Sequence, residues 1–162
     1  YSKTNEDKKY LASFVGSLTH PIRKSLYNQY DSDGDFKFKV KNWSPTINET
    51  DFNSFLEITQ SSKFTLCPRG YGKTSFRLYE SIQLNSIPVY ISDEFWLPFS
   101  NEINWEKFCI LIKPNELSNL KNLLKSIDDK KYQKMLLYGK YIWENYFEIN
   151  KICKKILKLY EN

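Results

Sequence analysis

Metal-ligating and crosslinking residues are scarce in this chain of 162 residues. It contains one histidine and three cysteines, and the cysteines (Cys67, Cys109 and Cys153) lie far apart and form no CxxC pair. A zinc site is therefore not expected, and an odd number of isolated thiols gives no disulfide framework. We expect free thiols buried in a core.

Glycine, proline and long apolar runs are also lacking. Five glycines and six prolines exclude a collagen-like or low-complexity chain. The sequence has no run of 18 apolar residues, so we predict no membrane-spanning segment. With 41% hydrophobic and 17% aromatic residues the chain can bury a core. Its length suits one domain, or half of a two-domain enzyme.

The net excess of positive charge lies at one end of the chain. The formal net charge is +5, and residues 130–162 alone hold eight Lys against three Glu. Residues 1–129 are therefore neutral overall. Because the C-terminal lysines are spread around predicted helices and interspersed with Glu, we predict no nucleic-acid partner.

Arginine is the rare basic residue. Of 24 basic side chains only Arg23, Arg69 and Arg77 are arginines. A chain that uses Lys almost everywhere else is expected to keep Arg for bidentate recognition of phosphate or carboxylate. Structural salt bridging is the alternative, and the sequence leaves it open.

Strand and helix patterns alternate from residue 11 to residue 127. This alternation predicts an α/β fold with a Rossmann-like, mostly parallel sheet flanked by helices. We expect a polar lead-in over 1–10, the α/β domain over 11–129 and added basic, aromatic-rich helices over 130–162. Strands are predicted at 11–16, 36–40, 64–67, 87–91 and 109–112. Helices are predicted from Pro21 to Tyr30 and at 51–60, 75–84, 116–127, 130–147 and 150–160, with a loop or short helix at 101–108.

Two predicted strand-to-helix turns are candidate ligand sites, because parallel sheets bind ligands at the carboxyl ends of strands, near helix N-terminal amides. The weaker turn runs from Gly16 to Arg23, and an ordinary tight turn with a surface Arg explains it equally well. The stronger runs from Cys67 to Glu80. There, paired glycines allow a ligand to approach the backbone, and Thr74 or Ser75 can cap the following helix.

Within the stronger turn, Arg77 and Glu80 are three residues apart and therefore share one helical face. Arg77 suits a diphosphate, and Glu80 suits the two hydroxyls of a ribose. This pairing indicates a nucleotide-sugar. The alternative is a helix-surface ion pair between the two residues, which contributes little to stability.

Three short motifs are set aside. Gly72-Lys73-Thr74 resembles the end of a Walker A loop, but the first glycine of that motif would fall at Cys67. Residues 31–35 resemble a calcium or DxD loop, but Gly34 is misplaced and Asn42 stands where the bidentate Glu belongs. A solvated, hairpin-like turn explains them better. The sequon at Asn48 is a triplet that is common by chance.

The central stretch from Lys63 to Phe99 resembles the signature of the exostosin family, glycosyltransferase family 47. Its elements are CPRG, then SxRL with a Glu three residues after the Arg, then IPV, a short Asp-bearing turn and LPF. Further similarity lies at 103–108, at 143–147 and at Phe14-Val15-Gly16 with Ile22-Arg23 and Leu26. The resemblance covers nearly the whole chain.

This resemblance implies the C-terminal, donor-binding half of a GT-B glycosyltransferase. It further implies inverting transfer from a nucleotide-sugar, usually a UDP-sugar, to a glycan acceptor, with no cofactor and no metal requirement. Carried over position by position, it implies a donor pocket formed by Arg69, Gly70, Ser75, Arg77 and Glu80, faced by Gly16 and Arg23, with Asp93 in the turn after the IPV strand.

Two departures from the family pattern bear on activity. Asn85-Ser86 replaces a Gly-Cys-like pair before IPV, which is a mild change. The N-terminal acceptor half is missing, and the catalytic base is expected there or in a partner chain. The alternative function is a non-catalytic nucleotide- or glycan-binding module. Since the chain begins with Tyr1 rather than Met, we expect a piece of a longer protein. Its compartment is open: cytoplasmic for a bacterial or viral chain, Golgi or ER lumen for a eukaryotic secretory one.

Overall fold

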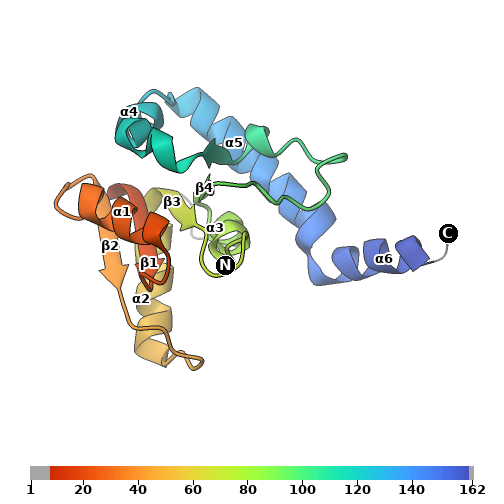
Figure 1. Cartoon of the computed structure of the whole chain (residues 1–162). Helices are drawn as coiled ribbons and strands as arrows, with labels where there is room; N and C mark the ends of the chain where they lie inside the picture. The colour runs from red at the N-terminus through yellow and green to blue at the C-terminus, as the bar shows by residue number, and fades with distance from the viewer. Residues whose placement is uncertain (1–7, 161–162) are drawn as a thin grey trace.

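A five-stranded parallel sheet forms the centre of the protein, with helices on both faces (Figure 1). The computed structural model describes residues 8–160. The strands lie in the order β2-β1-β3-β4-β5. The predicted α/β fold is confirmed. The strands are β1 (Tyr10–Gly16), β2 (Phe36–Val40), β3 (Ser62–Pro68), β4 (Ile87–Ile91) and β5 (Ile110–Ile112).

The helices begin at side chains that suit helix starts. Pro21 occupies the first turn of α1 after His20, and Asn48, the sequon residue, caps α2 by accepting a bond from the Asp51 amide at 2.8 Å. The helical elements are α1 (Pro21–Tyr30), α2 (Glu49–Gln60), α3 (Arg77–Gln83), η1 (Trp105–Lys107), η2 (Pro114–Asn119), α4 (Leu120–Lys125), α5 (Asp129–Ile142), the π-helical η3 (Trp143–Phe147) and α6 (Ile149–Tyr160).

The two faces of the sheet bury different cores. Along β1, Phe14 packs in one core with Leu26 of α1, whereas the next residue, Val15, packs on the other face with Phe55 of α2. The central strands β3 and β4 are therefore buried almost throughout, while the edge strand β2 buries Phe36 and exposes Lys37 and Val40. This arrangement leaves the two ends of the sheet to be shaped by loops.

Three predicted helices differ from the structure, and the one predicted at 116–127 is the 3-10 helix η2 followed by the short α4. The helix predicted at 75–84 begins only at Arg77, and its N-cap Phe76 makes no side-chain cap bond. The prediction that Thr74 or Ser75 caps it is wrong. The helix predicted at 130–147 is α5 followed by the π-helical η3, and the chain then turns at Glu148, whose ψ is 136°. Aromatic packing of η3 against α3 and η1 accompanies the change of winding.

The acidic turn between α1 and β2 is occupied by lysines. Lys121 of α4 contacts the carboxylates of Asp33 at 2.6 Å and Asp35 at 2.8 Å, and Lys125 contacts Asp35 at 2.8 Å. These bonds hold the pKa of both carboxyls below the ordinary value. The turn joins the helix α1 to the strand β2, and β2 runs parallel to β1, so the prediction of a hairpin-like turn is wrong. The lysine contacts tie α4 to this turn.

The C-terminal helices differ in how they attach. Tyr132 and Met135 of α5 belong to the same core as the strands. By contrast, α6 extends away from the sheet (Figure 1) and exposes Ile149, Ile156 and Leu157. The predicted lead-in over 1–10 falls mostly outside the described residues.

Replacing Leu78 with Ala tests the packing that holds α3 on the sheet. Leu78 is 0% exposed, so the truncation leaves a cavity and should lower the free energy of unfolding by about 2–5 kcal/mol. Urea denaturation measures the change. The matched control is Leu137→Ala on the exposed face of α5, for which a change within about 0.5 kcal/mol is expected. Equal effects of the two substitutions would contradict the assigned core.

Candidate functional site at the carboxyl edge of the sheet

The carboxyl ends of β1 and β3 form a topological switch point. The chain leaves β1 toward β2 on one side and leaves β3 toward β4 on the other, so the two loops diverge. In open parallel sheets, ligands bind in the crevice at such a point. Each of the three arginines of the sequence makes a bond at these strand ends.

Arg23 ties the two diverging loops together. Its Nε donates to the carbonyl of Arg69 at 3.0 Å, and its Nη1 donates to the carbonyl of Ser17 at 3.0 Å. Its Nη2 donates to the carbonyl of Pro68 at 3.2 Å. A Cβ at Gly70 would lie 2.9 Å from Nη2, so this glycine gives the guanidinium room. Arg23 therefore positions the main chain of both loops.

Arg77 and Glu80 form the ion pair that the sequence offered as the alternative to a ligand site. Arg77 Nη1 donates to a Glu80 carboxylate oxygen, and Arg77 Nε donates to the carbonyl of Val15 at 3.0 Å. The guanidinium lies 4.4 Å from the ring centre of Phe55. The side chains of Arg77 and Glu80 remain 22% and 39% exposed, so a ligand can reach both.

Arg69 and Asp93 connect the loops that follow β3 and β4. Arg69 Nη1 lies 2.6 Å from Asp93 Oδ1, and the Arg69 amide donates to the carbonyl of Ile91 at 3.0 Å. The bond from Arg69 holds the pKa of the Asp93 carboxyl below its ordinary value. Arg69 Nε is buried without a hydrogen-bond partner among the described residues.

Tyr90 fixes the loops that frame this edge. Its hydroxyl donates to the carbonyl of Lys73 at 2.7 Å and accepts from the Trp96 amide at 3.3 Å. Ser75, in the same loop as Lys73, is buried, whereas Phe76 is 83% exposed beside Arg77. The sequence analysis missed Tyr90, since nothing in a buried strand pattern marks one hydroxyl.

His20 is a second residue that the sequence analysis missed. Its Nδ1 accepts the bond that caps α1, from the Ile22 amide at 3.2 Å. Burial and the charges of Arg69 and Arg23 lower its pKa, and the charge of Asp93 opposes them. The signal was available, because the single histidine stands directly before Pro21 at a helix start.

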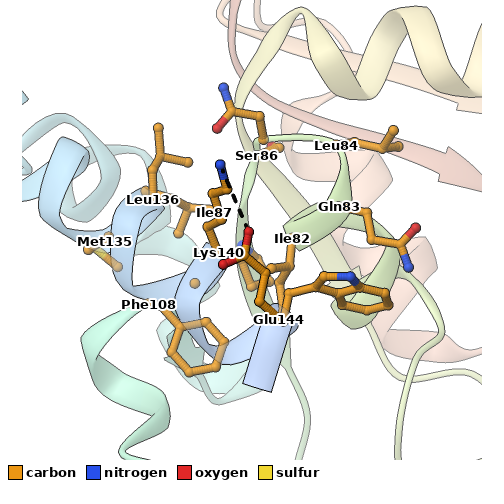
Figure 2. Close-up of a pocket in the computed structure, with 14 residues that line it drawn as sticks. Ile82, Gln83, Leu84, Ser86, Ile87, Phe108, Met135, Leu136, Lys140 and Glu144 are labelled. Atoms are coloured by element: carbon orange, nitrogen blue, oxygen red, sulfur yellow. Dashed lines mark ion pairs between the residues drawn. The ribbon is translucent and has the colours of Figure 1, made fainter. Parts of the chain in front are cut away.

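A cavity of about 430 Å³ lies at the opposite, amino edge of the sheet (Figure 2). Ser86 and Ile87, at the start of β4, line it together with apolar side chains of α3 and α5. Lys140 and Glu144 form an ion pair of 3.9 Å there. None of the predicted donor residues lines this cavity. The cavity and the switch point are therefore separate features.

Cysteine and metal chemistry find little support in the described residues. Burial raises the pKa of the Cys67 thiol to about 12, and raises that of Cys109 well above its ordinary value. Cys153 is exposed, so the expectation of buried thiols is wrong there. Over residues 8–160, no three His, Cys, Asp or Glu side chains gather to ligate a metal. Within that range, no helix has the length and apolar character needed to cross a bilayer.

Comparisons with known proteins match most of the chain to one family. The family model described as the exostosin GT47 domain matches residues 1–127. The chain is 34% identical over 144 residues to the probable glycosyltransferase At5g25310 of Arabidopsis thaliana, covering 88% of this chain and 28% of that protein. It is 29% identical over 175 residues to exostosin-1 of Mus musculus, covering 100% of this chain and 23% of that protein. The chain thus spans about a quarter of these relatives.

A solved structure shows the fold independently. The crystal structure of TarM superposes with a TM-score of 0.59 at 11% sequence identity. The match covers 100% of this chain and 37% of the TarM chain.

Replacing Arg23 with Lys tests the tie between the loops. An ammonium cannot bond three carbonyls in the planar geometry of a guanidinium, so the free energy of unfolding should fall by about 1–3 kcal/mol. Chemical denaturation measures it, with the exposed neighbour substitution Lys24→Arg as the control. An Arg23→Lys protein as stable as the control would show that the three bonds contribute nothing.

Proposed function

The chain belongs to the exostosin GT47 family of glycosyltransferases, and on that premise we propose that it binds the nucleotide-sugar donor of an inverting glycosyl transfer. A UDP-sugar is the proposed donor. The observation that carries the proposal is the convergence of all three arginines on the β1/β3 switch point. Three guanidiniums stand there against the carboxylates of Glu80 and Asp93, so the edge favours an anionic ligand.

Arg77 and Glu80 are proposed to hold the nucleotide together. The Arg77 guanidinium faces the diphosphate, and the one Glu80 carboxylate oxygen that Arg77 does not use accepts bonds from the ribose hydroxyls. The existing ion pair supports these roles, because it holds both side chains in place before the ligand arrives. Ligand binding then costs little additional ordering of these two residues.

The other predicted residues are proposed to shape the pocket around this pair. Gly70 leaves room for the Arg23 guanidinium and Gly16 for the ring of Phe14, and buried Ser75 supports the loop before α3. Asp93 orients Arg69 through their ion pair. Arg23 acts through the loops that it ties rather than by direct contact, since three of its donors already bond carbonyls.

In the proposed reaction, the acceptor hydroxyl attacks the anomeric carbon of the donor sugar. The bond between that carbon and the diphosphate oxygen breaks at the same time. The leaving diphosphate takes the bonding electron pair, and fixed guanidiniums beside it stabilise that developing charge. The base that removes the hydroxyl proton is proposed to come from an acceptor-binding half or a partner chain. No divalent cation is proposed, because the arginines supply the positive charge.

Binding of UDP tests the proposal by calorimetry. Glu80→Gln keeps the size of the side chain but removes its charge, so UDP affinity should fall by about tenfold or more. Arg77→Lys keeps the charge but loses the planar fork, and a similar loss is expected. Chelation with EDTA should leave wild-type affinity unchanged.

The matched control is Lys130→Gln, which removes a positive charge near the amino edge, where neighbouring Asp129 pairs with Lys63. Circular dichroism checks that every variant folds. Unchanged UDP affinity in a folded Glu80→Gln protein would contradict the placement of the ribose.

A further inference from the structure

The start of α1 at the switch point offers a side-chain donor instead of free amides. Pro21 has no N–H, the Ile22 amide bonds to the His20 ring, and the Arg23 amide donates to the His20 carbonyl at 3.0 Å. The expectation that helix N-terminal amides bind the ligand therefore fails for α1. What the first turn of α1 presents is the imidazole of His20.

The cap bond fixes the tautomer of that imidazole. Because Nδ1 accepts from the Ile22 amide, the proton of the neutral ring sits on Nε2. The ring is partly exposed, so Nε2–H can meet a ligand. His20 thus combines one nitrogen occupied by the cap bond with one nitrogen that carries a proton to donate.

Charged groups surround His20 on each neighbouring element. Arg23 stands on α1, Arg69 in the loop after β3 and Asp93 in the loop after β4. Arg23 and Arg69 are committed to carbonyls and to Asp93 respectively. In the same two loops, Lys73 and Glu94 pair with each other at 2.7 Å. The imidazole is the group in this cluster whose charge can change near neutral pH.

We propose that His20 donates a hydrogen bond from Nε2 to a phosphate oxygen of the bound nucleoside diphosphate and takes up a proton on Nδ1 as that ligand binds, which ends the bond that Nδ1 accepts from the Ile22 amide. This inference rests on the proposed function, because it names a further contact in the same pocket. Burial and the charges of Arg69 and Arg23 lower the pKa of the free ring, against the opposing charge of Asp93. A bound dianion reverses the local charge and favours the imidazolium. Binding is then coupled to pH through one residue.

Two substitutions separate the cap from the proposed contact. Asn at position 20 keeps a side-chain acceptor for the Ile22 amide but has no group that reaches the ligand or titrates. Gln places an amide donor near the position of Nε2 but loses the cap. His20→Asn should therefore fold like the wild type, while His20→Gln should retain more affinity at lower stability.

Calorimetric titration with UDP at about pH 6.5, the ordinary pKa of imidazole, tests the proposal. Titrations in PIPES and in Bis-Tris, whose ionisation enthalpies differ, give the number of protons taken up. The wild type should take up more protons than His20→Asn. Ionisation of UDP itself contributes equally to both proteins, so it cancels in the difference between them. His20→Asn should bind UDP about tenfold to a hundredfold more weakly.

The outcomes separate this inference from the proposal beneath it. If UDP does not bind the wild type, the proposed function fails for that nucleotide and this inference fails with it. If UDP binds the wild type and His20→Asn with equal affinity and equal proton uptake, the role of His20 is wrong and the donor pocket stands. Weaker binding of His20→Asn with no difference in proton uptake would overturn the proton-coupled part.

Discussion

Bonds between guanidiniums and main-chain carbonyls at one edge of the sheet hold the rest of the site in place. Strands β1 and β3 end side by side, and their loops depart in opposite directions. Without side-chain donors, the main-chain carbonyls at these strand ends would need hydrogen bonds from water. Arg23 and Arg77 bond four of them, those of Val15, Ser17, Pro68 and Arg69. Each bond to a charged donor is stronger than a neutral one.

These ties explain how one edge can concentrate positive charge. Arg23 and Arg77 lie close enough that the charge of Arg77, after burial, lowers the pKa of Arg23. Carbonyl oxygens and the carboxylates of Glu80 and Asp93 offset part of that repulsion. The remaining excess of positive charge favours an anion. The same guanidiniums lower the pKa of His20. The cavity at the amino edge is lined by none of these arginines.

The class of fold and the stretch that carries the site follow from the amino-acid pattern alone. Continuous apolar runs predicted the central strands, because a strand buried on both faces needs apolar residues throughout. Alternation of Phe and Lys predicted the edge strand β2, because a strand buried on one face alternates apolar and polar residues. The scarcity of arginine drew attention to three positions, and all three lie at the switch point. The resemblance around Lys63 to Phe99 named the family that the comparisons show.

The contacts of those residues are set by the folded chain and not by the local sequence. Arg23 bonds a carbonyl 45 residues away, Arg77 bonds one 62 residues away and Lys121 reaches Asp33 across 88 residues. Partners so distant leave no periodic signal in a single chain. The order of the strands, the tautomer of His20 and the break after Ile142 have the same origin. Each depends on which groups the folded chain brings within bonding distance, and propensity acts only between near neighbours along the sequence.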